Sequence, residues 1–265
     1  MDWTLIFSLL LKAWGLTATL MLLLWLVQAK TKNASYVDIG WTVGLGICAA
    51  VYVFNAQGLF LRKILLLTLG LIWCARLTGL LIRRLIKDPS EDSRYRRIRE
   101  DWRTGQNFKF FWMFQFQGLL DVVLSWPFLL ICLNSKGELG ALEFMGIILS
   151  LVGLAGESIA DDQLRVFKND PGNKGKTCDA GLWYFSRHPN YFFEWLIWVG
   201  YFVFAISAPF GVTAIVAPIL MIIFLLKVSG IPLAEAQALK TKGEDYRKYQ
   251  ASTSMFVPWP KRSSV

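Results

Sequence analysis

Long apolar runs with few charged residues recur along the whole chain and constrain its fold more than any other feature. A helix needs roughly 20 predominantly apolar residues to cross a bilayer. The sequence is 55% hydrophobic and 18% charged, whereas a soluble domain carries about 25% charge. We therefore expect an all-α protein, a single domain over residues 1–265 built as a seven-transmembrane helical bundle. The runs lie at about residues 5–27, 37–54, 61–82, 110–133, 139–160, 191–207 and 210–228.

The basic residues are divided unequally between the two sides of such a bundle. Lys and Arg exceed Asp and Glu by nine, and 22 of the 28 lie in segments 28–36, 83–109 and 161–187 and after residue 230. The opposite loops hold three, at Arg62, Lys63 and Lys136. The positive-inside rule then predicts an outward-facing N-terminus and a cytoplasmic C-terminus. The membrane is expected to be a bacterial inner membrane or an endoplasmic reticulum.

The two largest basic segments also contain acidic residues. Segment 83–109 has five Asp and Glu residues and segment 161–187 has four. Topology and attraction to anionic lipids explain the bases alone, but a structured polar pocket needs both signs of charge. We therefore interpret these segments as parts of a structured polar pocket. Nucleic acid is a poor partner because no binding module is recognisable, and a monomer surrounded by lipid is expected.

The sequence lacks the residues and motifs on which several common kinds of active site depend. The four cysteines form no C-x-x-C pair, and His188 is the single histidine, so a multi-histidine metal site is excluded and no metal is expected. The sequence has no G-x-G-x-x-G, P-loop or G-x-S-x-G motif. This argues against Rossmann, P-loop and hydrolase-elbow chemistry.

Ionisable residues inside the apolar runs are more informative. Each costs about 2.5–3.5 kcal/mol at the centre of a membrane helix and usually faces a partner or a cavity. The clear cases are Arg76, Asp121, Glu157 and Glu194. A structural pair between Arg76 and Asp121 would explain two of them without any function.

Helical spacing collects polar residues into two stripes. Glu157, Asp161, Arg165 and Lys168 share one face of the fifth predicted helix. At the start of the sixth, Pro189 suits a first helical position. Its neighbours Arg187, Asn190, Tyr191 and Glu194 then lie on one face. An interfacial anchor of Arg, His and Tyr is the simpler interpretation, but it requires neither Asn190 nor Glu194.

The combination of these motifs resembles the steroid 5α-reductase family in its bacterial branch, over nearly the whole chain. Residues 110–265 carry most of the motifs. The resemblance rests on Tyr36-Val-Asp-Ile-Gly-Trp41, Arg76 with Arg83, Glu91-Asp-Ser-Arg-Tyr95, Glu157 through Arg165 to Lys168, Gly181-Leu-Trp-Tyr-Phe-Ser-Arg-His-Pro-Asn-Tyr191 with Glu194, and Tyr246 through Pro260.

The resemblance implies a membrane reductase that holds NADPH in a pocket open to the cytoplasm and reduces a double bond conjugated to a ketone. Guanidinium and ammonium groups suit the phosphates of this cofactor, while acids and amides suit its ribose and carboxamide. The implied cofactor-contacting positions are Arg76, Asp161, Arg165, Lys168, Asn190 and Glu194, supported by Arg83, Asp92, Arg94, Tyr95, Arg99, Arg187, His188 and Tyr191.

The family pattern breaks at the catalytic positions. The steroid reductases hold the ketone with a glutamate and a tyrosine, and Asp38 and Trp73 stand at the corresponding places. An indole donates a hydrogen bond but delivers no proton, so Tyr36 is a second candidate donor. With Glu194, these residues are the predicted catalytic set. Otherwise, Asp38 is a helix-start cap and Tyr36 an interfacial aromatic.

Two other classes remain open. Isoprenylcysteine and phospholipid methyltransferases share a similar Arg-His-Pro segment and bind S-adenosylmethionine, but they need no basic clusters around Arg94 and Arg165. A transporter or scaffold shows broken or repeated helices, or polar residues at all depths of the bilayer. This sequence instead concentrates its polar groups on one side.

Overall fold

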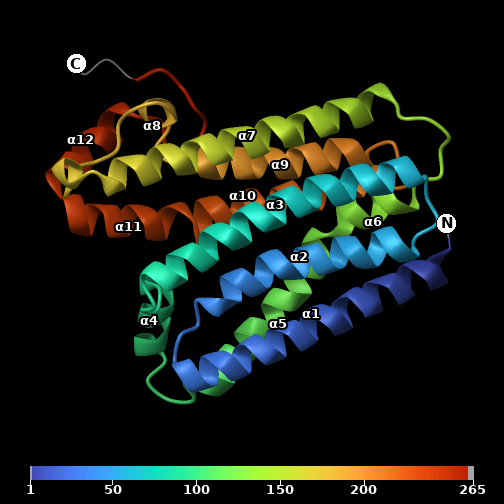
Figure 1. Ribbon diagram of the computed structural model, residues 1–265, viewed down its shortest axis with the longest axis horizontal. Coiled ribbons are helices and arrows are strands. Elements are labelled where there is room, and N and C mark those ends of the chain that lie inside the picture. The colour runs from blue at the N-terminus through green and yellow to red at the C-terminus, as the bar shows by residue number, and fades with distance from the viewer. Residues whose placement is uncertain (1, 262–265) are drawn as a thin grey trace. The chain divides into compact units, whose positions relative to one another are not determined.

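The computed structural model describes residues 2–261, and the regular secondary structure in that range is entirely helical (Figure 1). Within these residues, six helices are long and apolar enough to cross a membrane. The prediction of a multi-pass helical protein is therefore confirmed. The six span Trp3–Thr31, Tyr36–Asn55, Phe60–Lys87, Gln106–Leu133, Ala141–Asn169 and Gly211–Lys242.

The predicted sixth span, residues 191–207, corresponds to α9, Pro189–Ala205, which has 17 residues and is not among the six. The helix begins at Pro189, a residue that suits the first helical position. It ends at Ala205, shortly before Pro209, which cannot continue a helix. The last apolar run behaves in the opposite way, because it continues through a 3₁₀ turn, α10 and a π-turn into α11. The boundaries of the last two predicted helices therefore differ from the observed ones. Helix α9 begins and ends two residues earlier than predicted, and the last helical segment extends beyond residue 228.

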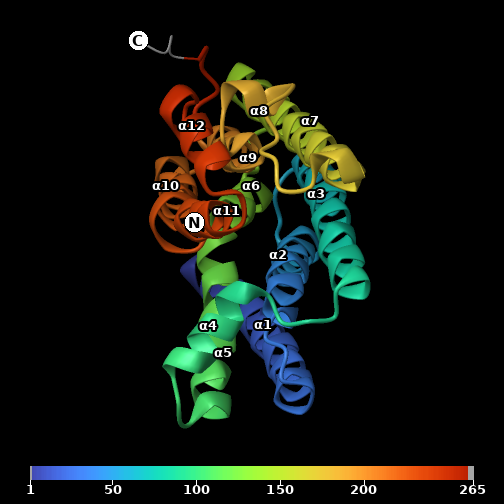
Figure 2. The same cartoon turned by 90° about the vertical axis from the view of Figure 1, so that its left-hand side faces the viewer.

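The described chain forms two compact units. Unit 1, residues 1–143 and 205–217, contains α1 (Trp3–Thr31), α2 (Tyr36–Asn55), α3 (Phe60–Lys87), α4 (Ser93–Asp101), α5 (Gln106–Leu124) and α6 (Trp126–Leu133). Helices α1, α2 and α5 pack against one another, and α3 packs on α2 (Figure 2). The short α4 follows α3, and its N-cap Asp92 accepts a hydrogen bond from the Arg94 backbone N–H.

Unit 2, residues 144–204 and 218–265, contains most of α7 (Ala141–Asn169), α8 (Leu182–Phe185), α9, α10 (Val216–Ile223), α11 (Ile231–Lys242) and α12 (Glu244–Ser252). A glycine lets α7 and α9 approach closely. A Cβ atom on Gly153 would lie 2.6 Å from Cγ1 of Ile197. Small residues of this kind bring membrane helices into backbone contact, and they set the register of the polar residues further along both helices.

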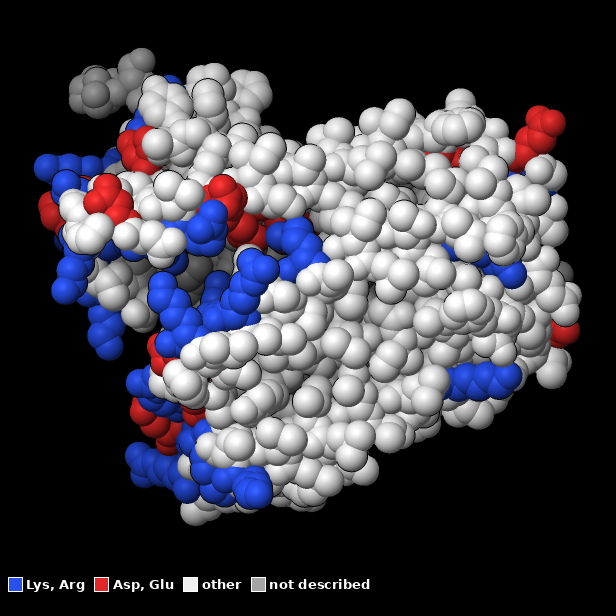
Figure 3. Space-filling view, in the orientation of Figure 1, with Lys and Arg blue, Asp and Glu red and all other residues white. Residues whose placement is uncertain are grey.

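The surface of unit 1 separates by charge. The long middle parts of its helices expose apolar side chains, whereas Lys and Arg gather where α3 ends and around α4 (Figure 3). We call this region, residues 28–38 and 83–109, the basic end of unit 1. An apolar belt bounded by charged ends is the pattern expected of helices in a bilayer.

Candidate functional site

Asp38 lies in the first turn of α2 and is held by two side chains from α4. The hydroxyl of Tyr95 donates to Oδ1 of Asp38 at 2.5 Å, and Nη2 of Arg94 donates to Oδ2 at 2.7 Å. Asp38 therefore acts neither as a cap of its own helix nor as a partner of Tyr36. The structure joins Asp38, Arg94 and Tyr95, which the sequence assigned to separate tasks, in one cluster.

A clasp between the α1–α2 turn and the start of α4 holds this cluster in place. Glu91 accepts hydrogen bonds from both Nε and Nη2 of Arg99, at 3.0 and 2.7 Å, and from the backbone N–H of Ala34 at 2.8 Å. Ser35 Oγ accepts the backbone N–H of Asp92 at 2.9 Å. Because the bonds to Ala34 and from Ser35 join residues 57 positions apart in sequence, they fix the start of α4 near the first turn of α2.

The cluster favours a neutral phenol beside a guanidinium. Burial raises the pKa of Tyr95 well above its ordinary value of 10.0, and the adjacent Asp38 raises it further. Burial by itself lowers the pKa of Arg94, but Asp38, Tyr95 and Asp92 outweigh it and the pKa is raised. Tyr95 is therefore a hydrogen-bond donor at neutral pH, and Arg94 keeps its charge.

Asp38 also lines a cavity of about 270 Å³ at the basic end of unit 1. Ile39 of α2 and Leu81 and Leu85 of α3 form an apolar wall, and Arg84 and Arg96 add charged groups. A concave site with apolar walls and a few convergent polar groups is the usual form of a small-molecule site. Asp38 is thus accessible to a ligand, whereas Arg94 and Tyr95 do not line this cavity.

A second polar cluster lies between α7 and α9 in unit 2. Nδ2 of Asn190 donates to Oδ1 of Asp161 at 3.2 Å. The Oδ1 atom of Asn190 is buried and has no hydrogen-bond partner within the described residues. One turn away from the pair, Glu157 and Glu194 are each 5% exposed, and Glu194 accepts the indole N–H of Trp198 at 2.9 Å. The two predicted stripes therefore meet, a contact that the spacing within each helix did not predict.

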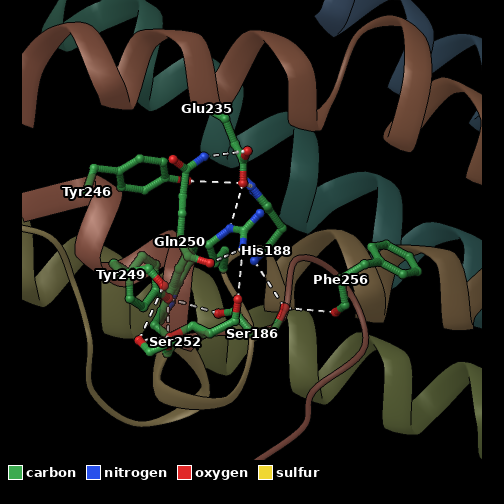
Figure 4. Close-up of polar contacts among 11 residues, drawn as sticks. Ser186, His188, Glu235, Tyr246, Tyr249, Gln250, Ser252 and Phe256 are labelled. Carbon is green, nitrogen blue, oxygen red and sulfur yellow. Dashed lines mark hydrogen bonds and ion pairs between the residues drawn. The ribbon is translucent and has the colours of Figure 1, made fainter. Parts of the chain in front are cut away.

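Arg187 and His188 belong to a third cluster, built around Glu235 of α11 (Figure 4). Oε1 of Glu235 lies 2.7 Å from Nε of Arg187 and 3.3 Å from Nε2 of His188, while Gln250 donates to Oε2 at 2.8 Å. Arg187 further donates to the backbone carbonyls of Gln250 and Thr253. These bonds attach the start of α9 to α11 and to the end of α12, so the first role that the contacts support for Arg187 and His188 is structural.

The other predicted site residues are distributed more widely. Trp73 is 3% exposed and packs edge-on against Trp41, with ring centroids 5.5 Å apart. Tyr191 stacks on His188 with centroids 5.5 Å apart. Arg165 pairs with Asp162 on the exposed end of α7. Tyr36 begins α2, Arg76 is half-buried in α3, and Arg83 and Lys168 are exposed.

The alternative interpretation of Arg76 and Asp121 as an ion pair is wrong. Asp121 is fully buried in α5, and neither of its carboxylate oxygens has a hydrogen-bond partner among the described residues. Its Oδ2 instead lies against Gly44 of α2, where a Cβ atom would be 2.1 Å away. The sequence shows that the acid is inside a span, but it does not show which neighbouring helix faces it.

Three residues of these clusters were missed by sequence reasoning. Glu235 is a lone acid directly after an apolar run, and that isolation is the signal that could have identified it. Arg84 and Arg96 lie within an exposed basic segment, where nothing in the spacing separates a cavity-lining base from a solvated one.

Comparison with known proteins assigns the chain to a family. Residues 24–253 match the family described as "protein of unknown function (DUF1295)", and the chain belongs to it. This family is part of the steroid 5α-reductase-like superfamily. No solved structure matches the chain.

Two curated relatives illustrate the range of the similarity. An uncharacterized protein of Schizosaccharomyces pombe is 28% identical over 211 residues, which are 70% of this chain and 61% of the relative. A probable O-methyltransferase of Ustilaginoidea virens, ustE, is 46% identical over 46 residues, which are 17% of this chain and 16% of that protein. The chain thus spans less than two thirds of either relative.

Proposed function

We propose that this DUF1295 protein is an NADPH-dependent membrane reductase that saturates a carbon–carbon double bond conjugated to a ketone in a steroid-like or other lipophilic substrate. The observation that carries the proposal is the 2.5 Å hydrogen bond between Tyr95 and Asp38 beside a cavity with an apolar wall. A neutral phenol next to a carboxylate and a guanidinium is suited to polarising a ketone oxygen.

Tyr95 and Arg94 have distinct tasks in the proposed reaction. In the free protein the one O–H proton of Tyr95 is donated to Asp38, so in the proposed reaction it turns from Asp38 to the ketone oxygen, which draws electron density away from the β-carbon. The negative charge that develops on that oxygen is stabilised by the phenol and by the positive charge of Arg94. Before the ketone binds, Asp38 keeps both side chains in position because each of its oxygens accepts a hydrogen bond from one of them.

The residues between α7 and α9 fit a nicotinamide cofactor. The buried Oδ1 atom of Asn190 needs a donor, and the amide N–H₂ group of a nicotinamide provides one. Asp161 holds the other end of the Asn190 side chain and so orients this oxygen. NADPH, when bound, would supply a hydride for the β-carbon, and the α-carbon would take the balancing proton from water. The buried Glu194 carboxylate, oriented by Trp198, is the nearest acidic group on the same helix face.

A second candidate function is methyl transfer from S-adenosylmethionine. It is favoured by the 46-residue match to a probable O-methyltransferase. The amino group of S-adenosylmethionine would also satisfy Asn190, so the α7–α9 cluster alone does not separate the two cofactors. The phenol–carboxylate pair at a cavity favours the reductase, because a ketone needs a polarising donor and a methyl group does not.

The two functions are separated by the cofactor that binds. Thermal unfolding of the purified protein in detergent is to be followed with NADPH, NADH and S-adenosylmethionine, first for the wild type and then for Asn190→Leu. The reductase proposal expects stabilisation by NADPH that exceeds that by NADH and is lost in Asn190→Leu. The exposed Gln237→Leu variant, from the same unit, serves as the matched control. Stabilisation by S-adenosylmethionine alone would replace the reductase by the methyltransferase.

A further inference from the structure

The cavity beside Asp38 has two chemically different walls. Leu81, Arg84 and Leu85 of α3 are spaced at i, i+3 and i+4, so they share one helix face, and Ile39 of α2 joins the apolar side. Arg96 of α4 lies on the opposite, polar side. One face of α3 therefore places a guanidinium directly between aliphatic side chains.

The carboxylates of the cavity already have hydrogen-bond donors. Both oxygens of Asp38 accept from Tyr95 and Arg94, and both oxygens of Asp92 accept from Arg94. The oxygens of Glu91 accept from Arg99 and from the backbone of Ala34. Asp88 Oδ1 accepts the backbone N–H of Ser90 at 3.0 Å. A cationic ligand would have to compete with these existing bonds.

The guanidinium groups of the cavity retain free donors. Within the described part of the chain, no carboxylate lies at ion-pair distance from Arg84 or Arg96. Arg96 uses Nη2 for the backbone carbonyl of Glu91, at 2.9 Å, and both side chains reach solvent. Since each guanidinium carries five N–H donors, the unused hydrogen-bonding capacity of the cavity matches an anionic group rich in acceptors.

The apolar wall continues onto the outer surface of α3. Ile82 is 41% exposed and Ile86 is 75% exposed, next to Leu81 and Leu85 in sequence. Exposed aliphatic side chains on a membrane helix face lipid. A ligand with an apolar body can therefore reach the cavity from the bilayer while its charged end stays near the membrane surface.

Resting on the proposed function, we infer that the substrate of the cavity is an acidic amphiphile: a lipophilic enone that carries a carboxylate or phosphate. Its anionic group binds Arg84 and Arg96, its adjacent chain lies on Ile39, Leu81 and Leu85, and its ketone faces Asp38, the member of the Asp38–Tyr95 pair that lines the cavity. The cavity volume of about 270 Å³ is slightly below the range of about 300–1,000 Å³ for sites that enclose a drug-sized ligand. The cavity therefore encloses the anionic group, the adjacent chain and the ketone, and the remaining apolar body of the ligand lies outside it.

Binding without a cofactor tests the inference independently of the reaction. The probes are a long-chain saturated oxo-acid and its methyl ester, measured by thermal shift and by titration in an uncharged detergent. The wild type is expected to bind the acid at least about tenfold more tightly than the ester, as charge-assisted hydrogen bonds imply. This preference should disappear in Arg84→Gln, return in part in Arg84→Lys and persist in Arg97→Gln, an exposed base on α4 that does not line the cavity.

Turnover separates this inference from the proposed function. A conjugated enone of the same acid and its methyl ester are each to be supplied with NADPH. If both are reduced equally well and bind equally well, the enzyme is a reductase and the inference about an acidic substrate is wrong. If the acid binds through Arg84 and neither compound is reduced, the inference about the cavity stands and the reductase proposal fails.

Two further outcomes would overturn the inference by assigning the guanidinium groups to another anion. If Arg84→Gln leaves acid binding unchanged but removes the discrimination between NADPH and NADH, the partner of Arg84 is the cofactor 2′-phosphate. If phosphatidylglycerol in nanodiscs displaces the acid from the wild type but phosphatidylcholine does not, the cavity binds a membrane lipid. Displacement by neither lipid supports an acidic substrate.

Discussion

The hydroxyl oxygen of Tyr95 lies 2.5 Å from Oδ1 of Asp38, although the two residues are 57 positions apart in the sequence. Arg94, the residue before Tyr95, binds the other oxygen of the same carboxylate. Two consecutive residues of the short helix α4 thus donate hydrogen bonds to the two carboxylate oxygens of Asp38. This arrangement supplies a phenol where the family pattern of the sequence offered only Trp73 or Tyr36.

Removing the Tyr95 hydroxyl is expected to impair the reaction and spare cofactor binding. In Tyr95→Phe the ring remains in place and the donor is lost, so kcat/KM for enone reduction should fall by at least about tenfold, or about 1.4 kcal/mol of transition-state stabilisation. NADPH affinity, measured by titration, should stay nearly unchanged. Asp38→Asn should behave similarly because it weakens the hold on both donors.

The matched control for this prediction is Tyr36→Phe, which removes a phenol from the first turn of the same helix α2. Its turnover should remain close to that of the wild type. If Tyr36→Phe loses activity and Tyr95→Phe does not, then Tyr36 is the donor, as the sequence alone allowed.

The sequence predicted these clusters to different extents, and the reason lies in the distance along the chain between partners. The stripe of Glu157 and Asp161 and the stripe of Asn190 and Glu194 follow from helical spacing, which is local. The pairing of Asp38 with Tyr95 depends on the clasp that joins Glu91 to the Ala34 backbone and Ser35 to the Asp92 backbone, two contacts between residues 57 positions apart. Periodicity contains no information about such a contact, because it identifies a face but not the element that covers it.

The Glu194 carboxylate provides a second test of the proposed function. Glu194→Gln retains an acceptor oxygen for the Trp198 indole, so the fold around α9 should be preserved while the charge is lost. Enone reduction should fall by at least about tenfold. The exposed Glu244→Gln in α12 should leave it unchanged. Full activity in a well-folded Glu194→Gln protein would identify Glu194 as a structural acid.

The close approach of α7 and α9 at Gly153 connects packing to the cofactor site. In Gly153→Ala the new Cβ would lie 2.6 Å from Ile197 Cγ1 and 2.9 Å from Ile197 N, so the two helices must separate. We expect a loss of about 1–3 kcal/mol in the free energy of unfolding and weaker NADPH binding, because Asp161 and Asn190 lie on the same two helices.

Gly79→Ala in α3 is the control for the Gly153 variant. A Cβ atom there meets nothing within 4 Å, so the substitution should be neutral or stabilise the helix by up to about 1 kcal/mol. Equal effects of the two alanine substitutions on unfolding would mean that the α7–α9 approach contributes nothing specific.

His188 predicts a dependence of stability on pH. Burial lowers its pKa below the ordinary value of 6.5, and this effect exceeds the opposing influence of Glu235. As the pH falls below about 6.5, the unfolded chain takes up a proton before the folded chain does, so stability is lost. The thermal midpoint in detergent should decline over this range, and His188→Gln should flatten the decline. An unchanged pH profile in His188→Gln would assign the titration to another group.

A buried ion pair at the other end of unit 1 provides a prediction about stability alone. Arg62 is fully buried, its Nε lies 2.6 Å from Oε1 of Glu143, and its remaining donors bind the backbone carbonyls of Lys136 and Glu138. In Glu143→Ala the guanidinium keeps its charge in a buried position without the carboxylate. This should cost about 3–5 kcal/mol of unfolding free energy, measured by denaturant titration in detergent.

Glu138→Ala removes an exposed carboxylate from the same loop but retains the carbonyl that Arg62 binds, so it should cost less than about 0.5 kcal/mol. The double variant Arg62→Met with Glu143→Leu should recover much of the loss, since it removes both buried charges and fills their volume. If the double variant is as unstable as Glu143→Ala, the loss comes from the hydrogen bonds that Glu143 and Arg62 make to this loop and not from an unpaired buried charge.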